Sequence, residues 1–302
     1  MRLTAAALAL LCAVSAHAAE TRPSITGVSH IAVYSSAPDR TERFYVHDLG
    51  GVKGQDPENP QGVRYYFART QFVEVLPLPA GPASINRLDH VAFITTDAEA
   101  LRKYLGAKQI AVPKQLAQGR DGSRWFDVTD PEGNKIELVQ PSAQAAEVAA
   151  NPLSSHIIHV GFIVHDRARE DGFFRTVLGF KPYWFGGMKD DTPTWVSQQV
   201  PDGTDWLEYM LNIKPDADAH LRGGMNHFSL GIAKMSDAVA ALARDGCTSK
   251  DCSKTQVGRD GKVQMNVYDP DLTRIEFMEF RPSGTICCSE FKGTHPTEVE
   301  NK

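Results

Sequence analysis

The feature that most constrains the fold of this chain is a pair of short sequence patterns that each recur four times. Histidine is the third residue of four apolar segments: VSHIAVYS from 28, LDHVAFIT from 88, IIHVGFIV from 157 and MNHFSLGI from 225. Glutamate is the fourth residue of four others: QFVEVLPL from 71, NKIELVQP from 134, DWLEYMLN from 205 and TRIEFMEF from 273. The separations His30–Glu74, His90–Glu137, His159–Glu208 and His227–Glu276 are 44, 47, 49 and 49 residues. This near-constant spacing indicates a repeated structural unit.

The segments between each histidine and its glutamate are also alike. A helical pattern follows each histidine strand, with Asp or Ser near its start and, in most cases, Gly at its end. Strand-like runs such as VRYYFART and SRWFDVTD come next, and turn signals such as DPEG and YDPD precede the glutamate strands. The predicted unit is therefore β-α-β-β-β, about 60 to 70 residues long and present four times.

An Ala- and Ser-rich stretch divides the four units into two pairs. We predict an N-terminal domain over 24–142, a linker over 143–155 and a C-terminal domain over 156–282. A cysteine-containing tail follows over 283–302. Each predicted domain is long enough to bury a core of its own.

The repeat resembles the vicinal oxygen chelate superfamily, which includes glyoxalase I, type I extradiol dioxygenases and bleomycin resistance proteins. The endings DPEGNKIELVQ and DPDLTRIEF carry the resemblance most clearly, although Leu272 stands where a Gly is usual in the second. The resemblance implies an α+β fold of four βαβββ modules, paired into two cupped, incomplete β-barrels. It also implies that the first and last strands of paired modules line each cup.

In such a cup, two histidines and two glutamates would come together and hold a divalent metal ion. The implied ligands are His30, Glu74, His90 and Glu137 in the first half, and His159, Glu208, His227 and Glu276 in the second. Imidazole and carboxylate donors suit Fe(II), Mn, Zn, Ni or Co. His156 is an alternative to His159, but its odd spacing places it on the opposite face of the strand. We expect the C-terminal half to be the active one, since one half is often vestigial in four-module relatives.

The resemblance leaves two metal-dependent reactions open. A glyoxalase-like lyase or isomerase, acting on a small oxygenated or aromatic molecule, is the first expectation, because a ligand glutamate can also move a proton. Glu208 and Glu276 are then the catalytic candidates. The runner-up is a type I extradiol dioxygenase, whose ligand set would be His159, His227 and Glu276.

Several positions argue against the dioxygenase. That family carries an acid–base tyrosine ten residues before its last ligand, where this chain has Asn266, and the nearest tyrosine is Tyr268. Its additional histidines have no clear counterpart, with His165 and His220 at unmatched positions.

A third hypothesis is a binding protein that sequesters a small molecule without catalysis, as bleomycin resistance members do. Those members lack the metal ligands, whereas this chain keeps all eight. Trp206, Phe228 and Asn266 are the predicted substrate-pocket residues. Glu279 has no counterpart in the other three repeats and is expected to lie outside the cup.

The first residues predict export. MRLTAAALALLCAVSAHAAE combines a basic start, an apolar stretch and an A-x-A site, so we expect cleavage after Ala18 and a periplasmic or secreted protein. The formal net charge of −5 and the absence of basic clusters in the sequence argue against nucleic-acid partners. We also expect no membrane span, and a monomer or homodimer.

The four cysteines of the mature chain are compatible with disulfides in an oxidising compartment. Cys247 and Cys252 could close a small loop, or that loop could be joined to the Cys287–Cys288 tail. The spacing is poor for a zinc ribbon.

Overall fold

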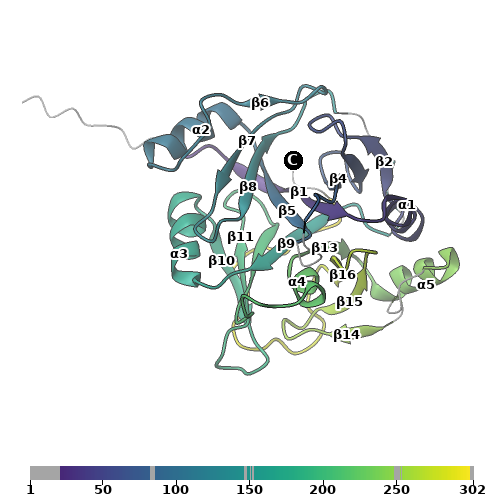
Figure 1. The fold of residues 1–302 in the computed structure, drawn as a ribbon. Helices are drawn as coiled ribbons and strands as arrows, with labels where there is room; N and C mark the ends of the chain where they lie inside the picture. Colours follow the sequence, from purple (N-terminus) through teal and green to yellow (C-terminus); the bar gives the residue numbers. More distant parts are fainter. Residues whose placement is uncertain are drawn as a thin grey trace, which may run out of the picture.

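The computed structural model describes residues 21–81, 86–145, 148–149, 151, 153–247, 252 and 254–299. These residues form two eight-stranded sheets, one from each half of the chain, which lie one above the other in Figure 1. The predicted signal segment falls outside the described residues. No helix among the described residues combines the length and the hydropathy needed to cross a bilayer.

The first sheet is built from the first two modules. The first module consists of β1 (Ile25–Ser35), α1 (Pro38–Glu42) continued by a π-helix (Arg43–Asp48), β2 (Val52–Gln55), β3 (Val63–Tyr66) and β4 (Phe72–Pro77). The second consists of β5 (Leu88–Thr95), α2 (Ala98–Ala107), β6 (Ala117–Gln118), β7 (Arg124–Thr129) and β8 (Lys135–Gln140). The strand order is β2-β3-β4-β1-β5-β8-β7-β6.

The second sheet repeats this plan. Its first module consists of β9 (Ile157–Ile163), α3 (Arg167–Asp171) with a π-helix (Gly172–Val177), β10 (Lys181–Gly186), β11 (Trp195–Gln199) and β12 (Trp206–Met210). Its second consists of β13 (His227–Ile232), α5 (Met235–Asp245), β14 (Thr255–Val257), β15 (Val263–Tyr268) and β16 (Arg274–Glu279). The helix α4 (Ala219–Met225) connects the two modules and was not predicted. The strand order β10-β11-β12-β9-β13-β16-β15-β14 confirms the paired βαβββ architecture.

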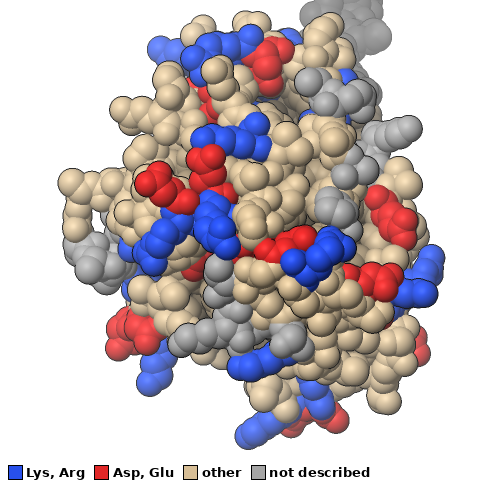
Figure 2. Space-filling model, turned by 90° about the vertical axis from the view of Figure 1, so that its right-hand side faces the viewer, with Lys and Arg blue, Asp and Glu red and all other residues tan. Residues whose placement is uncertain are grey.

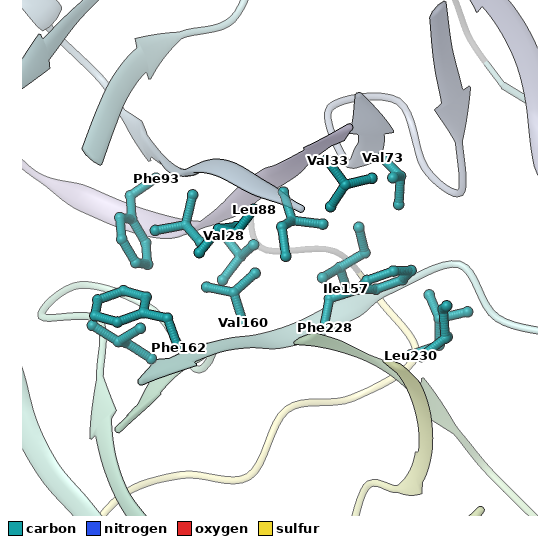
Figure 3. Close-up of a cluster of buried hydrophobic side chains, with 14 of the residues drawn as sticks. Val28, Val33, Val73, Leu88, Phe93, Ile157, Val160, Phe162, Phe228 and Leu230 are labelled. Atoms are coloured by element: carbon teal, nitrogen blue, oxygen red, sulfur yellow. The ribbon is translucent and has the colours of Figure 1, made fainter. Parts of the chain in front are cut away.

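Apolar side chains on the faces opposite the histidines join the two sheets. Val28 and Phe93 of the first sheet meet Val160, Phe162 and Phe228 of the second in one buried cluster (Figure 3). The apolar residues that alternate with the inward histidines therefore build the core between the halves. The histidines and glutamates lie on the opposite, concave face of each sheet.

The two DP turns have the same conformation in spite of their different sequences. Asp130 Oδ1 accepts hydrogen bonds from the backbone N–H groups of Glu132 and Asn134, and Gly133 has φ +91°. In the second turn Asp269 Oδ1 is bonded in the same way, and Leu272 takes the left-handed position with φ +74°. The turn is therefore preserved with leucine in place of glycine, although a left-handed backbone conformation is unfavourable for leucine.

The cysteines form two short-range disulfides, Cys247–Cys252 and Cys287–Cys288. The first closes the small loop that was one of the predicted alternatives. The tail is not joined to that loop by a disulfide. Figure 2 shows Lys and Arg side chains interspersed with Asp and Glu on one face of the molecule.

Gln71 connects the two halves through their backbones. Its Nε2 donates to the carbonyl oxygens of Val28 and Ile157, both at 2.9 Å, and its Oε1 accepts from Ile157 N at 2.8 Å. The side chain is only 1% exposed. Its loss would leave buried backbone groups of β1 and β9 unpaired.

We predict that Gln71→Ala lowers the free energy of unfolding by about 2–4 kcal/mol, because several buried hydrogen bonds are lost together. Urea unfolding monitored by circular dichroism measures this. Gln118→Ala is the control, since Gln118 is exposed on β6 and its truncation should cost less than about 0.5 kcal/mol. Equal effects of the two substitutions would contradict the role of Gln71.

Candidate metal centres

The antiparallel pairing of the two histidine strands sets the geometry of each centre. In the first sheet Ala92 lies opposite His30, and Ala32 lies opposite His90. In the second, Ser229 lies opposite His159, and Gly161 opposite His227. The small residues leave room for the rings, since a Cβ on Gly161 would come within 2.2 Å of His227 Cε1.

The glutamates join the histidines through parallel strand pairs. Glu74 lies beside Ala32 on β1, and Glu137 lies beside Ala92 on β5. Glu208 lies beside Gly161 and Glu276 beside Ser229 in the second sheet. Because the first and last strands of every module are parallel neighbours, each cup receives two imidazoles and two carboxylates on its concave face.

The N-terminal donors converge at short distances. His30 Nε2 and His90 Nε2 are 3.0 Å apart, and His90 Nε2 lies 3.6 Å from Glu74 Oε2 and 3.6 Å from Glu137 Oε2. His30, Glu74 and His90 form a group whose donor atoms all lie within 4.8 Å of one another. All four side chains are at most 4% exposed.

The C-terminal donors repeat this arrangement. His159 Nε2 and His227 Nε2 are 3.1 Å apart, with Glu276 Oε2 3.3 Å from the first and Glu208 Oε2 3.5 Å from the second. His159, Glu208 and His227 form the group within 4.8 Å. The side chain of Glu208 keeps 12% of its surface exposed, and the other three donors are at most 5% exposed.

In each centre, one histidine makes a hydrogen bond through Nδ1, the ring nitrogen that points away from the centre. This bond leaves Nε2, which faces the centre, without a proton. His227 Nδ1 donates to the carbonyl oxygen of Met225 at 2.8 Å, which leaves its Nε2 as an acceptor. His90 Nδ1 lies 2.6 Å from Asp89 Oδ2, and this carboxylate also binds Lys135 and Tyr34. In each centre, a bare imidazole nitrogen with carboxylates at close range fits a bound cation.

The charges around the N-terminal centre also fit a cation. Arg64 Nη2 lies 2.5 Å from Glu58 Oε1, and its Nε lies 3.3 Å from Asp56 Oδ1, so one buried arginine faces two further acids. Burial, together with Asp56, raises the pKa of Glu74 to about 9. Burial and the neighbouring carboxylates raise the pKa of Glu137 well above its usual range. A divalent cation would offset this excess of negative charge.

The C-terminal centre has more positive charge nearby. Burial alone would raise the pKa of Glu276, but His159, Arg274 and His227 outweigh it and the pKa is lowered. Lys262 is fully buried, and burial lowers its pKa to about 8 against the attraction of Asp260, Glu276 and Glu208. The two centres therefore share donors but differ in their surroundings.

The three predicted pocket residues lie in different places in the structure. Trp206 lies beside the centre, with its ring 4.6 Å from that of His159. Asn266 pairs with Glu276 across β15 and β16, and its Oδ1 is buried without a hydrogen-bond partner among the described residues. Phe228 was a wrong prediction, because it alternates with His227 and packs 6.3 Å from Phe67 in the core between the sheets.

The remaining candidates lie away from the donors. His156 Nε2 is 2.8 Å from Asp205 Oδ1, so it faces away from the centre as predicted. Tyr268 stacks on His220, and His165 binds Glu132. Glu279 accepts a hydrogen bond from Met235 N at the start of α5.

Several charged residues near the two centres were not predicted from the sequence, because they lie in the modules outside the recurring histidine and glutamate segments. Asp56 and Glu58 come from the loop between β2 and β3, and Lys262 precedes β15. None of them recurs in the other modules, so the repeat carried no signal for them. Arg64 could have been found, because it stands in the alternating run VRYY and its pairing with Glu74 places it in the cup.

The chain belongs to the Glyoxalase/Bleomycin resistance protein/Dioxygenase superfamily, whose model matches residues 27–138 and 156–277. No curated protein matches the sequence. The 2,3-dioxygenase LapB from Pseudomonas sp. KL28 is 16% identical, with a TM-score of 0.61 over 93% of this chain and 98% of that one.

Two further structures show the range of chemistry on this fold. The Mn(II)-bound glyoxalase from Novosphingobium aromaticivorans is 15% identical, with a TM-score of 0.64 over 92% of this chain and 87% of that one. The E323L mutant of homoprotocatechuate 2,3-dioxygenase from Brevibacterium fuscum is also 15% identical, with a TM-score of 0.64 over 93% and 76%. At these identities the likeness is one of fold.

We predict that Mn(II) raises the melting temperature more at pH 8 than at pH 6. In metal-free protein Glu74 keeps its proton up to about pH 9, whereas an unfolded glutamate releases it near pH 4.5. The unfolded state therefore binds fewer protons in this window, and the stability of the metal-free protein falls as pH rises. Mn(II) replaces the proton on Glu74. For each proton released, the stabilisation of the folded protein by Mn(II) should therefore grow by up to about 1.4 kcal/mol per unit rise in pH.

Differential scanning calorimetry with and without Mn(II) at both pH values tests this. Burial lowers the pKa of both His30 and His90, which favours neutral rings in the metal-free protein. Glu74→Gln cannot release a proton and should reduce the pH dependence. An identical metal-induced shift at pH 6 and pH 8 would contradict the assignment.

Proposed function

We propose that this protein is a divalent-metal enzyme that holds a small substrate by two neighbouring oxygens and cleaves an aromatic diol with O2. The observation that carries the proposal is the donor group in each half, which consists of two histidines and one glutamate within 4.8 Å. Two histidines and one carboxylate with open positions are typical of non-haem Fe(II) oxygenases. A metal in this site would supply a Lewis acid for the diol oxygens and a binding position for O2.

The chain itself would orient the diol and move its protons. The fourth carboxylate of each cup, Glu137 or Glu276, lies beside the histidine pair and is the candidate to accept the diol proton. In the C-terminal cup this departs from the ligand set His159, His227 and Glu276 that the resemblance implied, because Glu208 belongs to the close donor group there. Both atoms of O2 enter the ring-opened product, so the reaction needs no external reductant. The buried histidines and glutamates keep bulk water away from the reacting atoms.

The comparisons support this reaction over the lyase or isomerase that the sequence favoured. Several of the similar solved structures are ring-cleaving dioxygenases, among them LapB, a catechol 2,3-dioxygenase and homoprotocatechuate 2,3-dioxygenase, and the last was solved with 3,4-dihydroxyphenylacetate. That compound is a planar diol with an acidic side chain. The full four-module layout is shared with LapB over 93% of this chain.

A lyase or isomerase reaction is the second candidate, and the fourth glutamate favours it. If Glu137 or Glu276 also bound the metal, four protein donors would hold it. Such a site would have room for a chelating substrate and less room for O2. The fold of the Mn(II)-bound glyoxalase is compatible with this alternative.

Pure sequestration of a ligand is less well supported, because all eight predicted donors face the interiors of the cups. Export from the cytoplasm remains part of the proposal and rests on the first 18 residues.

We predict that Fe(II)-loaded protein consumes one O2 per molecule of 3,4-dihydroxyphenylacetate and forms a yellow ring-opened product. An oxygen electrode and visible absorbance measure this, with an argon-flushed sample as the control. Turnover that continues under argon would favour the lyase or isomerase. Binding without turnover under either gas would contradict both reactions and support sequestration.

A further inference from the structure

The two cups differ in whether they leave space for a substrate. A cavity of about 590 Å³ lies in the N-terminal cup, lined by residues that include Ser29, Tyr66, Phe72, Ser123 and Val139. Ser29 Oγ lies 3.1 Å from His30 Nδ1, and the Phe72 ring stacks on His30 at 4.3 Å. The cavity therefore adjoins the donor set through side chains that touch His30.

The corresponding space in the C-terminal cup is filled. Strand register makes Trp206 the counterpart of Phe72, and Met278 the counterpart of Val139. Ile158 takes the extra position in β9 that Ser29 takes in β1. These larger side chains form a second apolar cluster that includes Ile158, Tyr183, Trp184, Trp206, Met278 and Phe280. The counterpart of the cavity is thus a packed core.

A buried lysine occupies the middle of this cluster. Lys262 stands at the position of Ser123, and its Nζ lies 4.6 Å from the ring centre of Trp206 and 5.5 Å from that of Phe291. Its Nζ has no hydrogen-bond partner among the described residues. The ammonium group is thus held by aromatic faces in the volume that a substrate would need.

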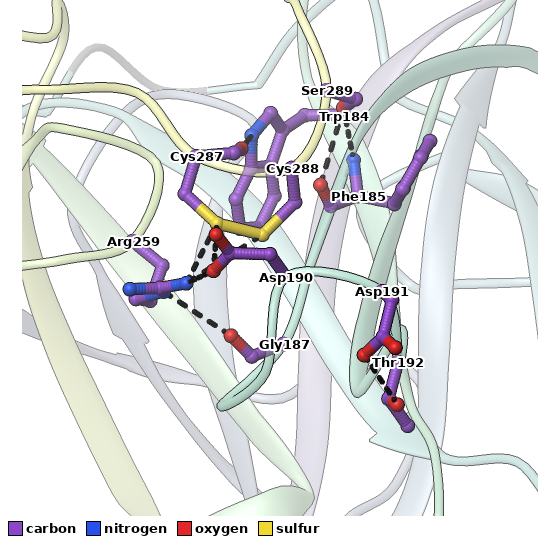
Figure 4. Close-up of a disulfide and its surroundings, with 10 residues drawn as sticks. All are labelled: Trp184, Phe185, Gly187, Asp190, Asp191, Thr192, Arg259, Cys287, Cys288 and Ser289. Carbon is purple, nitrogen blue, oxygen red and sulfur yellow. Dashed lines mark hydrogen bonds and ion pairs between the residues drawn. A yellow bond between two sulfur atoms is a disulfide. The ribbon is translucent and has the colours of Figure 1, made fainter.

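The second sheet curves so that its edge strands β10 and β14 lie on either side of a gap. The tail that follows residue 282 runs along this gap and closes the C-terminal cup. On one edge Gly261 O accepts from Gly284 N, and Arg259 O accepts from Cys287 N. On the other edge, β10, Lys292 N donates to Tyr183 O at 2.9 Å. Figure 4 shows the Cys287–Cys288 disulfide against Trp184, whose Nε1 donates to Cys287 O at 3.2 Å.

The tail continues inward past this edge. Phe291 packs 4.9 Å from Tyr183 and 6.2 Å from Trp184, and His295 Nδ1 lies 2.6 Å from the Tyr183 hydroxyl. In the N-terminal cup the equivalent gap, between β2 and the loop before β7, is the mouth of the cavity. The tail thus covers the C-terminal cup, whereas the described residues of 141–149 line the N-terminal cavity without filling it.

We infer that the N-terminal cup is the one that admits substrate, and that it takes a planar aromatic diol with an acidic substituent. The inference rests on the proposed function and departs from the expectation that the C-terminal half is the active one. It concerns the substrate and not the metal, because both cups keep a complete donor group.

The cavity lining matches this class of substrate. Tyr66 and Phe72 offer aromatic surface, with ring centres 5.1 Å apart. Lys53, Arg64, Arg69 and Arg120 line the cavity together with a single acid, Asp121. Lys53 also pairs with Glu42, and Arg64 with Asp56 and Glu58, outside the lining. This imbalance of charge on an acidic protein favours an anionic substituent near the mouth.

Matched substitutions at equivalent positions test the inference. Val139→Phe narrows the N-terminal cavity, and Met278→Phe alters the same position of the C-terminal cup, while both leave the eight donors intact. Isothermal titration of 3,4-dihydroxybenzoate into Mn(II)-loaded full-length protein under argon measures binding without turnover. Metal content and melting temperature of each variant show that the protein is folded and loaded.

We expect one ligand per chain, binding at least tenfold weaker in Val139→Phe and unchanged in Met278→Phe. Loss of binding in Met278→Phe alone, with folding and metal retained, would assign the substrate to the C-terminal cup and overturn the inference. The proposed function would survive that result. No metal-dependent binding to the wild type would overturn the proposed function itself.

Catechol tests the acidic substituent separately. We expect it to bind about fivefold weaker than 3,4-dihydroxybenzoate, the scale of an exposed charge interaction. Equal affinity of the two probes would overturn the predicted substrate class and leave the assignment to the N-terminal cup standing.

Discussion

Antiparallel pairing of the two histidine strands in each half brings two imidazoles to 3.0 or 3.1 Å of each other inside a cup. This arrangement is possible because the residue opposite each histidine is small, as Ala92, Ala32, Ser229 and Gly161 are. Buried carboxylates on the neighbouring parallel strands complete a set of polar groups that an apolar barrel could not otherwise tolerate. A divalent cation held between these donors would offset this cost.

The two halves share their donors and strand order but differ in the side chains that line the cups. The N-terminal centre is surrounded by further acids and one arginine, and it adjoins a cavity of about 590 Å³. The C-terminal centre lies under a lysine, an aromatic cluster and the tail of the chain. A metal centre with the same donors can thus serve a substrate in one half and lie beneath packed side chains in the other.

The module order and the eight inward residues could be predicted from the sequence, because the same residue type recurs at the same position in all four modules. The sequence could not predict which cup is open, because Lys262 and Phe291 have no counterparts in the other modules. Phe228 was placed in the pocket although strand alternation with His227 sends it to the core. The extra strand residues Ser29 and Ile158 also escaped prediction, because the sequence around them shows no signal for a β-bulge.

The most direct test of the account is a crystal structure of Mn(II)-soaked protein with anomalous scattering measured at the manganese edge. The account predicts two peaks per chain, one between His30 and His90 and one between His159 and His227, each within coordination distance of Nε2 atoms and at least one glutamate. The absence of a peak at both positions in metal-saturated crystals would contradict the claim that these buried donors form metal centres.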